Sequence, residues 1–397
     1  MQRIAGAVLG ASVLAASLLA AEAGPAATAE AASTGVTVTV VGGPLNAPKH
    51  LILTPAGLLV TESGAGGTSK ANCVTGPATG GTNLVRYCAG LTGAVSLIRG
   101  HSVPLAVPLP SLIEEDTQEV AGPAAVAFNG DSQAVVFQDV LETKDGGNTL
   151  PKPFGTFFGS LLLRRGGTVV RADLAAFAAA HPQPASSLGD FPGETAYNSD
   201  PYDVVAYRGG YVVADAGANS LLEVSEQGTI RLLARFPTLA EQAPANLIGN
   251  PKPITIQAQA VPTSVAVGPD GALYVSLLRG VPSDPGTAYI YRVVPGHRPT
   301  IWARGLTAVT AIAFDSEGRL LATEYNVHGL LAPATVPGAL VRISRNGHTV
   351  TKLPVHGLYQ PTGVAAGPGG VVYVSNYGGN VATDRRPGQL LKITGLS

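Results

Sequence analysis

The stretch VPTSVAVGPDGALYVSLLRG, residues 261–280, shows how the whole chain is built. Its apolar residues alternate on both sides of a GPDG turn at 268–271, which predicts two short strands joined as a β-hairpin. A second predicted hairpin follows, with strands at 288–294 and 298–304 around a PGH turn. Four such strands make a sheet too small to bury its own apolar face, so the unit needs neighbours of its own kind.

Five further copies of the first hairpin occur along the chain. Each has a residue that is usually Pro, a short apolar strand, a turn rich in Gly, Asp or Asn, and a second apolar strand. The copies are APKHLILTPAGLLVTES (47–63), GPAAVAFNGDSQAVVFQD (122–139), DPYDVVAYRGGYVVADAG (200–217), AVTAIAFDSEGRLLATEY (308–325) and QPTGVAAGPGGVVYVSNY (360–377). Six copies indicate a repeat architecture.

The second hairpin of the unit also repeats, and the last unit is incomplete. Its copies lie at 93–99, 160–174, 220–236, 288–304 and 340–354, and the last unit ends on a single strand at 388–396. One more strand, VTVTVV at 36–41, precedes the first unit. The sequence therefore predicts an all-β, six-bladed β-propeller, in which the N-terminal strand completes the last blade and closes the ring.

The segment ADLAAFAAAHP at 172–182 departs from the strand pattern. It is rich in Ala, has Asp173 near its start and ends before a Pro, which predicts a short helix between the second and third blades. Its Leu174 and Phe177 are expected to cover a blade edge.

The N-terminus has the features of a secretory signal peptide. Arg3 is followed by an apolar run to residue 20 and then by the small-residue motifs AEA (21–23) and ATA (27–29). We expect a signal peptide within residues 1–32, cleaved between about 23 and 32, and a single propeller domain at 33–397. The alternative is an uncleaved anchor, although the run barely reaches spanning length. The expected location is secreted or extracytoplasmic, without membrane insertion after cleavage.

Composition restricts the partners of this protein. Cleavage would remove Arg3 from 25 basic residues and Glu22 and Glu30 from 26 acidic ones, which leaves 24 of each. A neutral chain with 13% charged residues argues against nucleic acid or an anionic membrane surface as a partner. With 50 Gly and 31 Pro, the chain is turn-rich but folded, and we expect a monomer.

Cys73 and Cys88 are the two cysteines of the chain, and both lie in one segment rich in Gly, Thr and Asn. An exported protein meets oxidising conditions, so we expect a disulfide that pins this segment as a loop. A free pair or half of a metal site are the alternatives, and two Cys without a nearby His pair are weak support for zinc.

Three blocks of the sequence carry a resemblance to a known family. They are TESGAGG with CVTG and RYCAG, then NSDPYDVVAYRGGYVVADAGANSLLEV, then QAVPTSVAVGPDGALYVSLLRG. Together they resemble the ScyD/ScyE family of secreted propeller proteins over essentially the whole mature chain. The resemblance implies an exported six-bladed propeller with repeats similar to NHL repeats, and it brings no catalytic residues.

Strand order predicts which face of the ring carries function. The GPDG-type turns lie on one face, and the loops between the second and third strands of each blade lie on the other. Those loops are long in five blades, at 63–92, 140–159, 277–287, 325–338 and 376–387. Long loops on one rim of a rigid scaffold are where binding usually sits.

Polar residues are predicted at the channel mouth on this long-loop face. Candidate metal ligands are Glu62, Asp139, Asp215, Glu324 and Asn376, with His50, Asp203 and Ser276 as further channel-mouth candidates. Such oxygen-rich sets can hold a hard cation such as Ca²⁺, which could be structural, bind a ligand or polarise an ester carbonyl. The alternative is that these side chains only solvate the channel and cap open backbone groups.

The sequence favours an exported, non-catalytic propeller that binds a small molecule, glycan, peptide or extracellular protein on its long-loop face. A Ca²⁺-dependent hydrolase or lactonase using the channel carboxylates is the alternative. The chain has neither an HExxH motif nor a GxSxG elbow. Because propellers serve many functions, the fold alone does not decide between these classes.

Overall fold

The computed structural model of this protein describes residues 35–77, 84–99, 102–138, 141, 144–191, 194–379 and 386–396. The predicted signal peptide lies outside these residues. The described part is all-β, and six of its sheets have four or more antiparallel strands.

The first three sheets contain the strands up to Arg235. Sheet 1 is formed by β2 (Pro48–Thr54), β3 (Gly57–Glu62), β5 (Leu84–Ile98), β6 (Ser102–Glu114) and β7 (Val120–Ala121), with β4 (Cys73–Pro77) paired to β5. Sheet 2 is formed by β8 (Pro123–Asn129), β9 (Ser132–Phe137), β10 (Ser160–Arg165) and β11 (Thr168–Asp173). Sheet 3 is formed by β12 (Pro201–Tyr207), β13 (Gly210–Asp215), β14 (Ser220–Ser225) and β15 (Ile230–Arg235).

The other three sheets follow a two-stranded ribbon of β16 (Leu239–Ala243) and β17 (Ile254–Ala258). Sheet 4 is formed by β18 (Pro262–Val267), β19 (Leu273–Leu277), β20 (Ala288–Val293) and β21 (Thr300–Leu306). Sheet 5 is formed by β22 (Val309–Phe314), β23 (Leu320–Glu324), β24 (Ala339–Ile343) and β25 (Val350–Lys352). Sheet 6 is formed by β26 (Gly363–Ala366), β27 (Val372–Asn376), β28 (Gly388–Thr394) and β1 (Thr37–Leu45).

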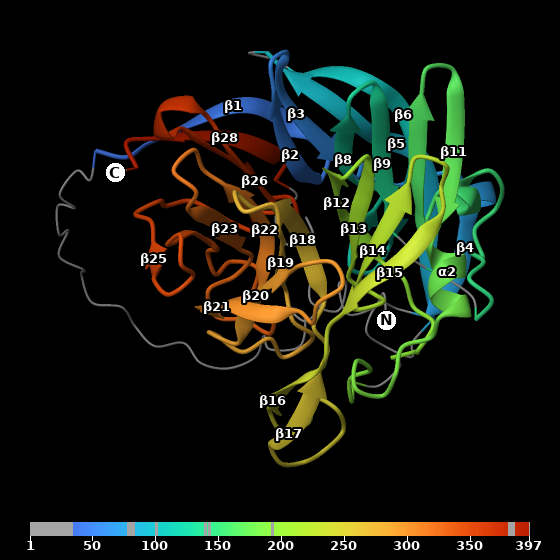
Figure 1. Cartoon of the computed structure of the whole chain (residues 1–397). Coiled ribbons are helices and arrows are strands. Elements are labelled where there is room, and N and C mark those ends of the chain that lie inside the picture. The colour runs from blue at the N-terminus through green and yellow to red at the C-terminus, as the bar shows by residue number, and fades with distance from the viewer. Residues whose placement is uncertain are drawn as a thin grey trace, which may run out of the picture.

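The first strands of the six sheets surround a common axis. In chain order, β2, β8, β12, β18, β22 and β26 each contact the next, and β26 contacts β2. Their labels encircle the middle of the molecule in Figure 1. This cyclic arrangement of antiparallel sheets around a central channel is that of a β-propeller.

Apolar layers between neighbouring sheets form the core. Between sheets 2 and 3, for example, Val136 and Leu161 pack with Val213 and Leu222, and all four are at most 1% exposed. Similar clusters join sheets 3 and 4, 4 and 5, 5 and 6, and 6 and 1. Each sheet therefore covers an apolar face that its neighbour could not bury alone.

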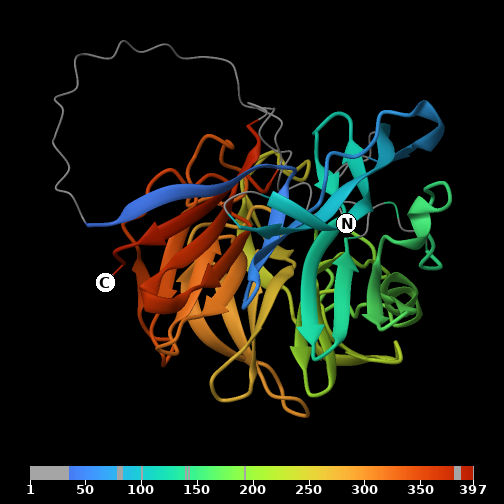
Figure 2. The same ribbon diagram turned by 90° about the horizontal axis from the view of Figure 1, so that it is seen from above.

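The predicted pairing of the N-terminal strand with the last unit is confirmed. β1 pairs antiparallel with β28, and Figure 2 shows the blue N-terminal strand beside the red C-terminal strand. Near the end of β1, Leu45 is 2% exposed and packs in the cluster between sheets 6 and 1, which also contains Leu390 of β28 and Leu51 of β2. The two ends of the chain thus share one sheet.

The helix prediction for 172–182 is also confirmed. Helix α2 (Leu174–Ala180) follows β11 directly, and the Asp173 carboxylate caps it by accepting a hydrogen bond from the Ala176 N–H. Leu174 is fully buried in the cluster between sheets 2 and 3, against which Phe177 packs. The short 3₁₀ helices are Lys70–Asn72, Phe154–Thr156 and Pro368–Gly370.

Two parts of the chain differ from the sequence prediction. Much of the expected loop at 63–92 is strand, because β4 pairs with the first part of the long strand β5 and extends sheet 1 beyond four strands. The ribbon β16–β17 was not predicted at all, and it projects from the body of the molecule in Figure 1. Both additions are strand pairs outside the repeat, so comparison of the copies could not find them.

We expect Leu45→Ala to lower the free energy of unfolding by about 3 kcal/mol, because it empties a buried site in the strand that closes the ring. Urea denaturation followed by circular dichroism measures the change. The matched control is Val40→Ala on the same strand, whose side chain is 55% exposed and whose loss should cost less than about 0.5 kcal/mol. Similar losses in both variants would contradict the closing role of Leu45.

Candidate functional site

The six inner strands begin at equivalent positions around the neck of the channel. In order of the sheets, the three residues at these positions are Pro48-Lys49-His50, Pro123-Ala124-Ala125, Pro201-Tyr202-Asp203, Pro262-Thr263-Ser264, Val309-Thr310-Ala311 and Pro361-Thr362-Gly363. Sheets 1 and 3 alone place ionisable side chains there. The neck is therefore chemically asymmetric although the scaffold repeats.

His50 and Asp203 meet across the neck. His50 Nε2 lies 3.4 Å from Asp203 Oδ1, and the intervening strand of sheet 2 offers only the methyl groups of Ala124 and Ala125 at this level. The side chain of His50 is 21% exposed and that of Asp203 is 4% exposed. The small residues of sheet 2 leave room for this pair.

Asp203 is held firmly by its neighbours. Its Oδ2 accepts hydrogen bonds from Ser264 Oγ at 2.6 Å and from the Val265 N–H at 2.9 Å, while Oδ1 accepts one from the Val204 N–H. Ser264 Oγ in turn accepts a hydrogen bond from the Ile312 N–H. This network connects sheets 1, 3, 4 and 5 and fixes the carboxylate that faces His50.

Lys49 and Tyr202 lie next to this pair, one residue nearer the long-loop face. Lys49 Nζ is 5.9 Å from the centroid of the Tyr202 ring. Burial lowers the pKa of Lys49 to about 8, against the attraction of Glu119 and Asp200. Burial also raises the pKa of the Tyr202 hydroxyl, helped by the nearby carboxylates. The neck is thus a poorly solvated environment for charge.

The lowered pKa of Lys49 predicts a pH dependence of stability. Between its folded value of about 8 and its ordinary 10.5, the unfolded chain holds the proton that the folded chain has released, so this group makes stability rise with pH. We expect wild type to gain on the order of 3 kcal/mol relative to Lys49→Met across that interval. Urea denaturation at pH 7.5 to 10 measures the difference.

The control for this measurement is Lys252→Met, because Lys252 is exposed in the turn of the ribbon. Its stability should follow that of wild type at every pH. Parallel curves for wild type and Lys49→Met would show that Lys49 releases its proton at its ordinary pKa in the folded protein.

A funnel opens from this neck towards the face that carries the hairpin turns, which we call the turn face. It has a volume of about 810 Å³ and is lined by the inner strands of all six sheets. Its wall includes the partly exposed side chains of Leu53, Phe128 and Val267, each 37–38% exposed. Among the described residues its lining includes no Asp, Glu, Lys or Arg, and His50 lies at its inner end. As far as the structure describes it, the funnel is therefore an apolar cavity with one ionisable side chain.

An apolar cluster occupies the long-loop end beside Tyr202. It is formed by Ala216, Val261, Leu278, Val281, Ala308, Tyr325 and Leu330, with Phe191, Tyr202, Leu247 and Leu331 packed against it. These side chains come from the loops of sheets 3, 4 and 5, from the segment before sheet 3 and from the ribbon. The loops thus pack down on one another around the channel end, and the funnel lies on the opposite face.

Four of the predicted metal ligands act as caps within their own sheets. Each ends the second strand of its sheet and accepts a hydrogen bond from a backbone N–H just before the inner strand. The pairs are Glu62 with Asn46, Asp215 with Asp200, Glu324 with Thr307, and Asn376 with Tyr359, at 2.7–2.8 Å. Burial raises the pKa of Asp215 and of Glu324. The structure does not bring these four side chains together.

The remaining predicted site residues have different positions. Asp139 lies outside the described residues. Ser276 Oγ is 3.3 Å from Thr263 Oγ1 inside sheet 4, where both hydroxyls are buried. Of the whole predicted set, the structure brings together His50 and Asp203.

We expect the cap at Asp215 to depend on its oxygen acceptor and not on its charge. Its Oδ1 accepts the N–H groups of Asp200 and Ala218, and its Oδ2 accepts the Ser199 hydroxyl. Asp215→Asn should keep the two N–H contacts through its amide oxygen, while its NH2 group donates to Ser199 Oγ, and it should change the free energy of unfolding by less than about 1 kcal/mol, as the natural Asn376 suggests. Asp215→Leu leaves two buried N–H groups unpaired and should cost roughly 2–4 kcal/mol. Equal losses in denaturation experiments would refute the cap.

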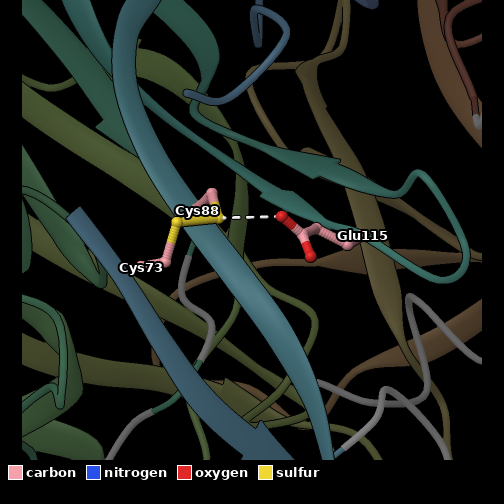
Figure 3. Close-up of side chains that lie close together, drawn as sticks. All are labelled: Cys73, Cys88 and Glu115. Atoms are coloured by element: carbon pink, nitrogen blue, oxygen red, sulfur yellow. Dashed lines mark hydrogen bonds between the residues drawn. A yellow bond between two sulfur atoms is a disulfide. The ribbon is translucent and has the colours of Figure 1, made fainter. Parts of the chain in front are cut away.

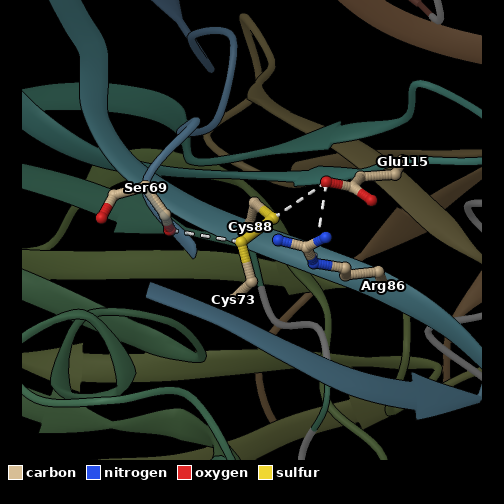
Figure 4. Close-up of a disulfide and its surroundings, with 5 residues drawn as sticks. All are labelled: Ser69, Cys73, Arg86, Cys88 and Glu115. Atoms are coloured by element: carbon tan, nitrogen blue, oxygen red, sulfur yellow. Dashed lines mark hydrogen bonds and ion pairs between the residues drawn. A yellow bond between two sulfur atoms is a disulfide. The ribbon is translucent and has the colours of Figure 1, made fainter. Parts of the chain in front are cut away.

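A disulfide joins Cys73 and Cys88, as predicted, with an S–S distance of 2.04 Å. The two residues face each other across β4 and β5. In Figure 4 the Ser69 carbonyl oxygen lies 3.3 Å from Cys73 Sγ, and Glu115 Oε1 lies 3.2 Å from Cys88 Sγ and 3.8 Å from Arg86 Nε. The bridge fastens the extension of sheet 1.

Cys73, Cys88 and Glu115 also form the one cluster within the described ranges whose His, Cys, Asp or Glu atoms come close enough to hold a metal ion (Figure 3). Metal binding by Cys requires the thiolate, and both sulfurs are committed to the disulfide. The oxidised protein therefore does not offer a sulfur metal site here.

This chain was compared with protein families, curated proteins and solved structures. No protein-family model matches the sequence, and no curated protein matches it. Among the described residues, no helix is long and apolar enough to cross a membrane.

Several solved structures match this chain at low similarity. A catalytically inactive variant of virginiamycin B lyase from Staphylococcus aureus with quinupristin is 12% identical, with a TM-score of 0.47 over 90% of this chain and 98% of that one. A putative glucose dehydrogenase from Thermus thermophilus is 15% identical, with a TM-score of 0.48 over 91% and 100%. A putative gluconolactonase is 10% identical, with a TM-score of 0.44 over 90% and 92%. These values are too low to transfer an activity or a site.

Proposed function

We propose that this protein is an exported β-propeller whose six sheets are six blades, and that it binds a neutral, mainly apolar small molecule in the turn-face funnel. The observation that carries this proposal is the cavity of about 810 Å³ at the channel axis, whose described lining residues include no Asp, Glu, Lys or Arg. A charged ligand would lose its hydration there without gaining a partner of opposite charge.

The size and chemistry of the funnel suit a small-molecule ligand. Ligand sites commonly enclose 300–1,000 Å³, are mostly apolar and have few polar groups, which fix orientation. Leu53, Phe128 and Val267 are partly exposed in the funnel wall. Covering them removes apolar area from water, which is favourable by about 25 cal/mol per Å².

The remaining parts of this proposal come from the sequence. Export and membership of a ScyD/ScyE-like family are inferred from the signal peptide and from the three family-like blocks. The Cys73–Cys88 disulfide is compatible with an extracytoplasmic location. Binding of a glycan or a protein partner to the long-loop face stays a prediction, while the cavity favours the turn face for a small molecule.

The geometry supports binding better than Ca²⁺-dependent hydrolysis. Glu62, Asp215, Glu324 and Asn376 already accept backbone hydrogen bonds in four different sheets. A cation would have to compete with these caps for its oxygen ligands. A rise in melting temperature with millimolar Ca²⁺ that EDTA reverses would support the hydrolase alternative.

We expect the uncharged fluorophore 1-N-phenylnaphthylamine to bind the purified protein with increased, blue-shifted emission. Val267→Asp places a charge in the funnel wall and should raise the dissociation constant at least tenfold, since the charge must then share an apolar cavity with the probe. Fluorescence titration measures both constants.

The matched control is Val169→Asp on the outer strand β11, where the side chain is 61% exposed and far from the funnel lining. This variant should bind the probe as wild type does. Absence of probe binding by wild type, or equal binding by Val267→Asp, would reject the funnel as the site.

A further inference from the structure

We infer that the funnel recognises an apolar molecule that ends in a hydrogen-bond donor, such as an alcohol or a phenol, and that His50 accepts this hydrogen bond. The inference rests on the proposed function, because it describes how a molecule inside the funnel is oriented. It assigns His50 as the polar contact of the ligand and Asp203 as the residue that positions His50.

The polar content of the funnel lining is very small. The polar side chains among its described lining residues are His50 and Thr54. Thr54 donates its hydroxyl to the Gly57 carbonyl oxygen within the hairpin turn, at 2.8 Å. His50 lies at the inner end, where the funnel meets the neck. A ligand that enters from the turn face with a polar end leading therefore reaches His50.

Asp203 determines which nitrogen of His50 carries the proton. Its carboxylate can only accept hydrogen bonds, and its Oδ1 faces His50 Nε2 at 3.4 Å. The hydrogen of a neutral imidazole is therefore placed on Nε2. Nδ1 is left with a lone pair, which makes it an acceptor.

His50 Nδ1 is buried and has no hydrogen-bond partner among the described residues. A buried acceptor without a partner is costly, and a donor from the ligand removes that cost. The His50 side chain is 21% exposed and lines the funnel, so we expect a ligand at the inner end to reach Nδ1 after a small turn of the ring that keeps Nε2 beside Asp203. A ligand end that can only accept, such as an ether oxygen, would instead meet a lone pair.

The test compares two isomers of which one can donate a hydrogen bond and the other cannot. 1-Decanol and methyl nonyl ether have the same atoms, but the alcohol can donate a hydrogen bond and the ether cannot. Each displaces bound 1-N-phenylnaphthylamine in a fluorescence competition. We expect the alcohol to compete at least tenfold more strongly than the ether with wild type. His50→Phe should bring this ratio close to one while the fluorophore still binds.

A second variant distinguishes recognition from a structural role of the pair. In Asp203→Asn the side-chain amide can donate to His50 Nε2, so the hydrogen of the neutral ring moves to Nδ1, which becomes a donor. The preference should then disappear, because the oxygens of the alcohol and of the ether can both accept a hydrogen bond from Nδ1. Loss of packing alone would weaken both isomers together and would leave their ratio unchanged.

The outcomes separate the two proposals. If the fluorophore binds wild type but the isomers compete equally, or if Asp203→Asn keeps the preference for the alcohol, the role of His50 is rejected and the funnel remains a binding site. If the fluorophore does not bind wild type, the proposed function itself fails. Circular dichroism of both variants at the assay temperature establishes that they are folded.

Discussion

A four-stranded antiparallel sheet with two apolar faces cannot bury either face alone, and this constraint determines the rest of the structure. Each sheet is covered by the next, as Val136 and Leu161 of sheet 2 are covered by Val213 and Leu222 of sheet 3. Once the ring is closed, the first and last sheets cover each other and neither has an exposed apolar face. Pairing of β1 with β28 provides that closure, because it completes sheet 6 with residues from the other end of the chain. The inner strands are then forced to meet around one axis.

That convergence explains how a repeated scaffold can hold a single site. In sheets 4, 5 and 6 the second residue at the neck is Thr, and its hydroxyl donates to the backbone of the following sheet: Thr263 to Val309, Thr310 to Pro361 and Thr362 to Pro48, at 2.6–2.7 Å. Sheet 1 has Lys49 at this position. The contact of sheet 1 with sheet 2 is made instead by Thr61 of β3 and by Ser63 just after it, which donate to the carbonyl oxygens of Ala124 and Pro123. Sheets 1 and 2 are therefore still joined by side-chain hydrogen bonds, and position 49 does not have to make them. A charged side chain can occupy it.

The sequence could predict the parts of the fold that repeat. Six copies of one hairpin and the extra strand at 36–41 were enough to predict the all-β propeller arrangement and the pairing of β1 with β28. The extension of sheet 1 and the ribbon at 239–258 occur once, so no comparison between copies could reveal them. The positions of single residues in the fold were more predictable from the sequence than the contacts between their side chains. The repeat alignment placed His50 and Asp203 at the channel, but their pairing depends on the small size of Ala124 and Ala125 in the sheet between them.

The polar residues that end the second strands show why a position at the channel does not identify a functional site. Glu62, Asp215, Glu324 and Asn376 recur at one position of the repeat, and each accepts a backbone hydrogen bond from the segment before its inner strand. A residue that recurs with the repeat serves a need that the repeated units share, namely the pairing of buried backbone groups. The ionisable side chains at the neck do not recur.

Long loops are equally ambiguous, for a related reason. The long loops of sheets 4 and 5 carry apolar side chains such as Leu278 and Leu330 that pack in one cluster, so their length serves to cover the channel end. The turn face has only short connections between the first and second strands, which cannot fold back over the axis. An apolar cavity therefore stays open on that face, and its chemistry is determined by the one non-repeating pair at its inner end, His50 and Asp203.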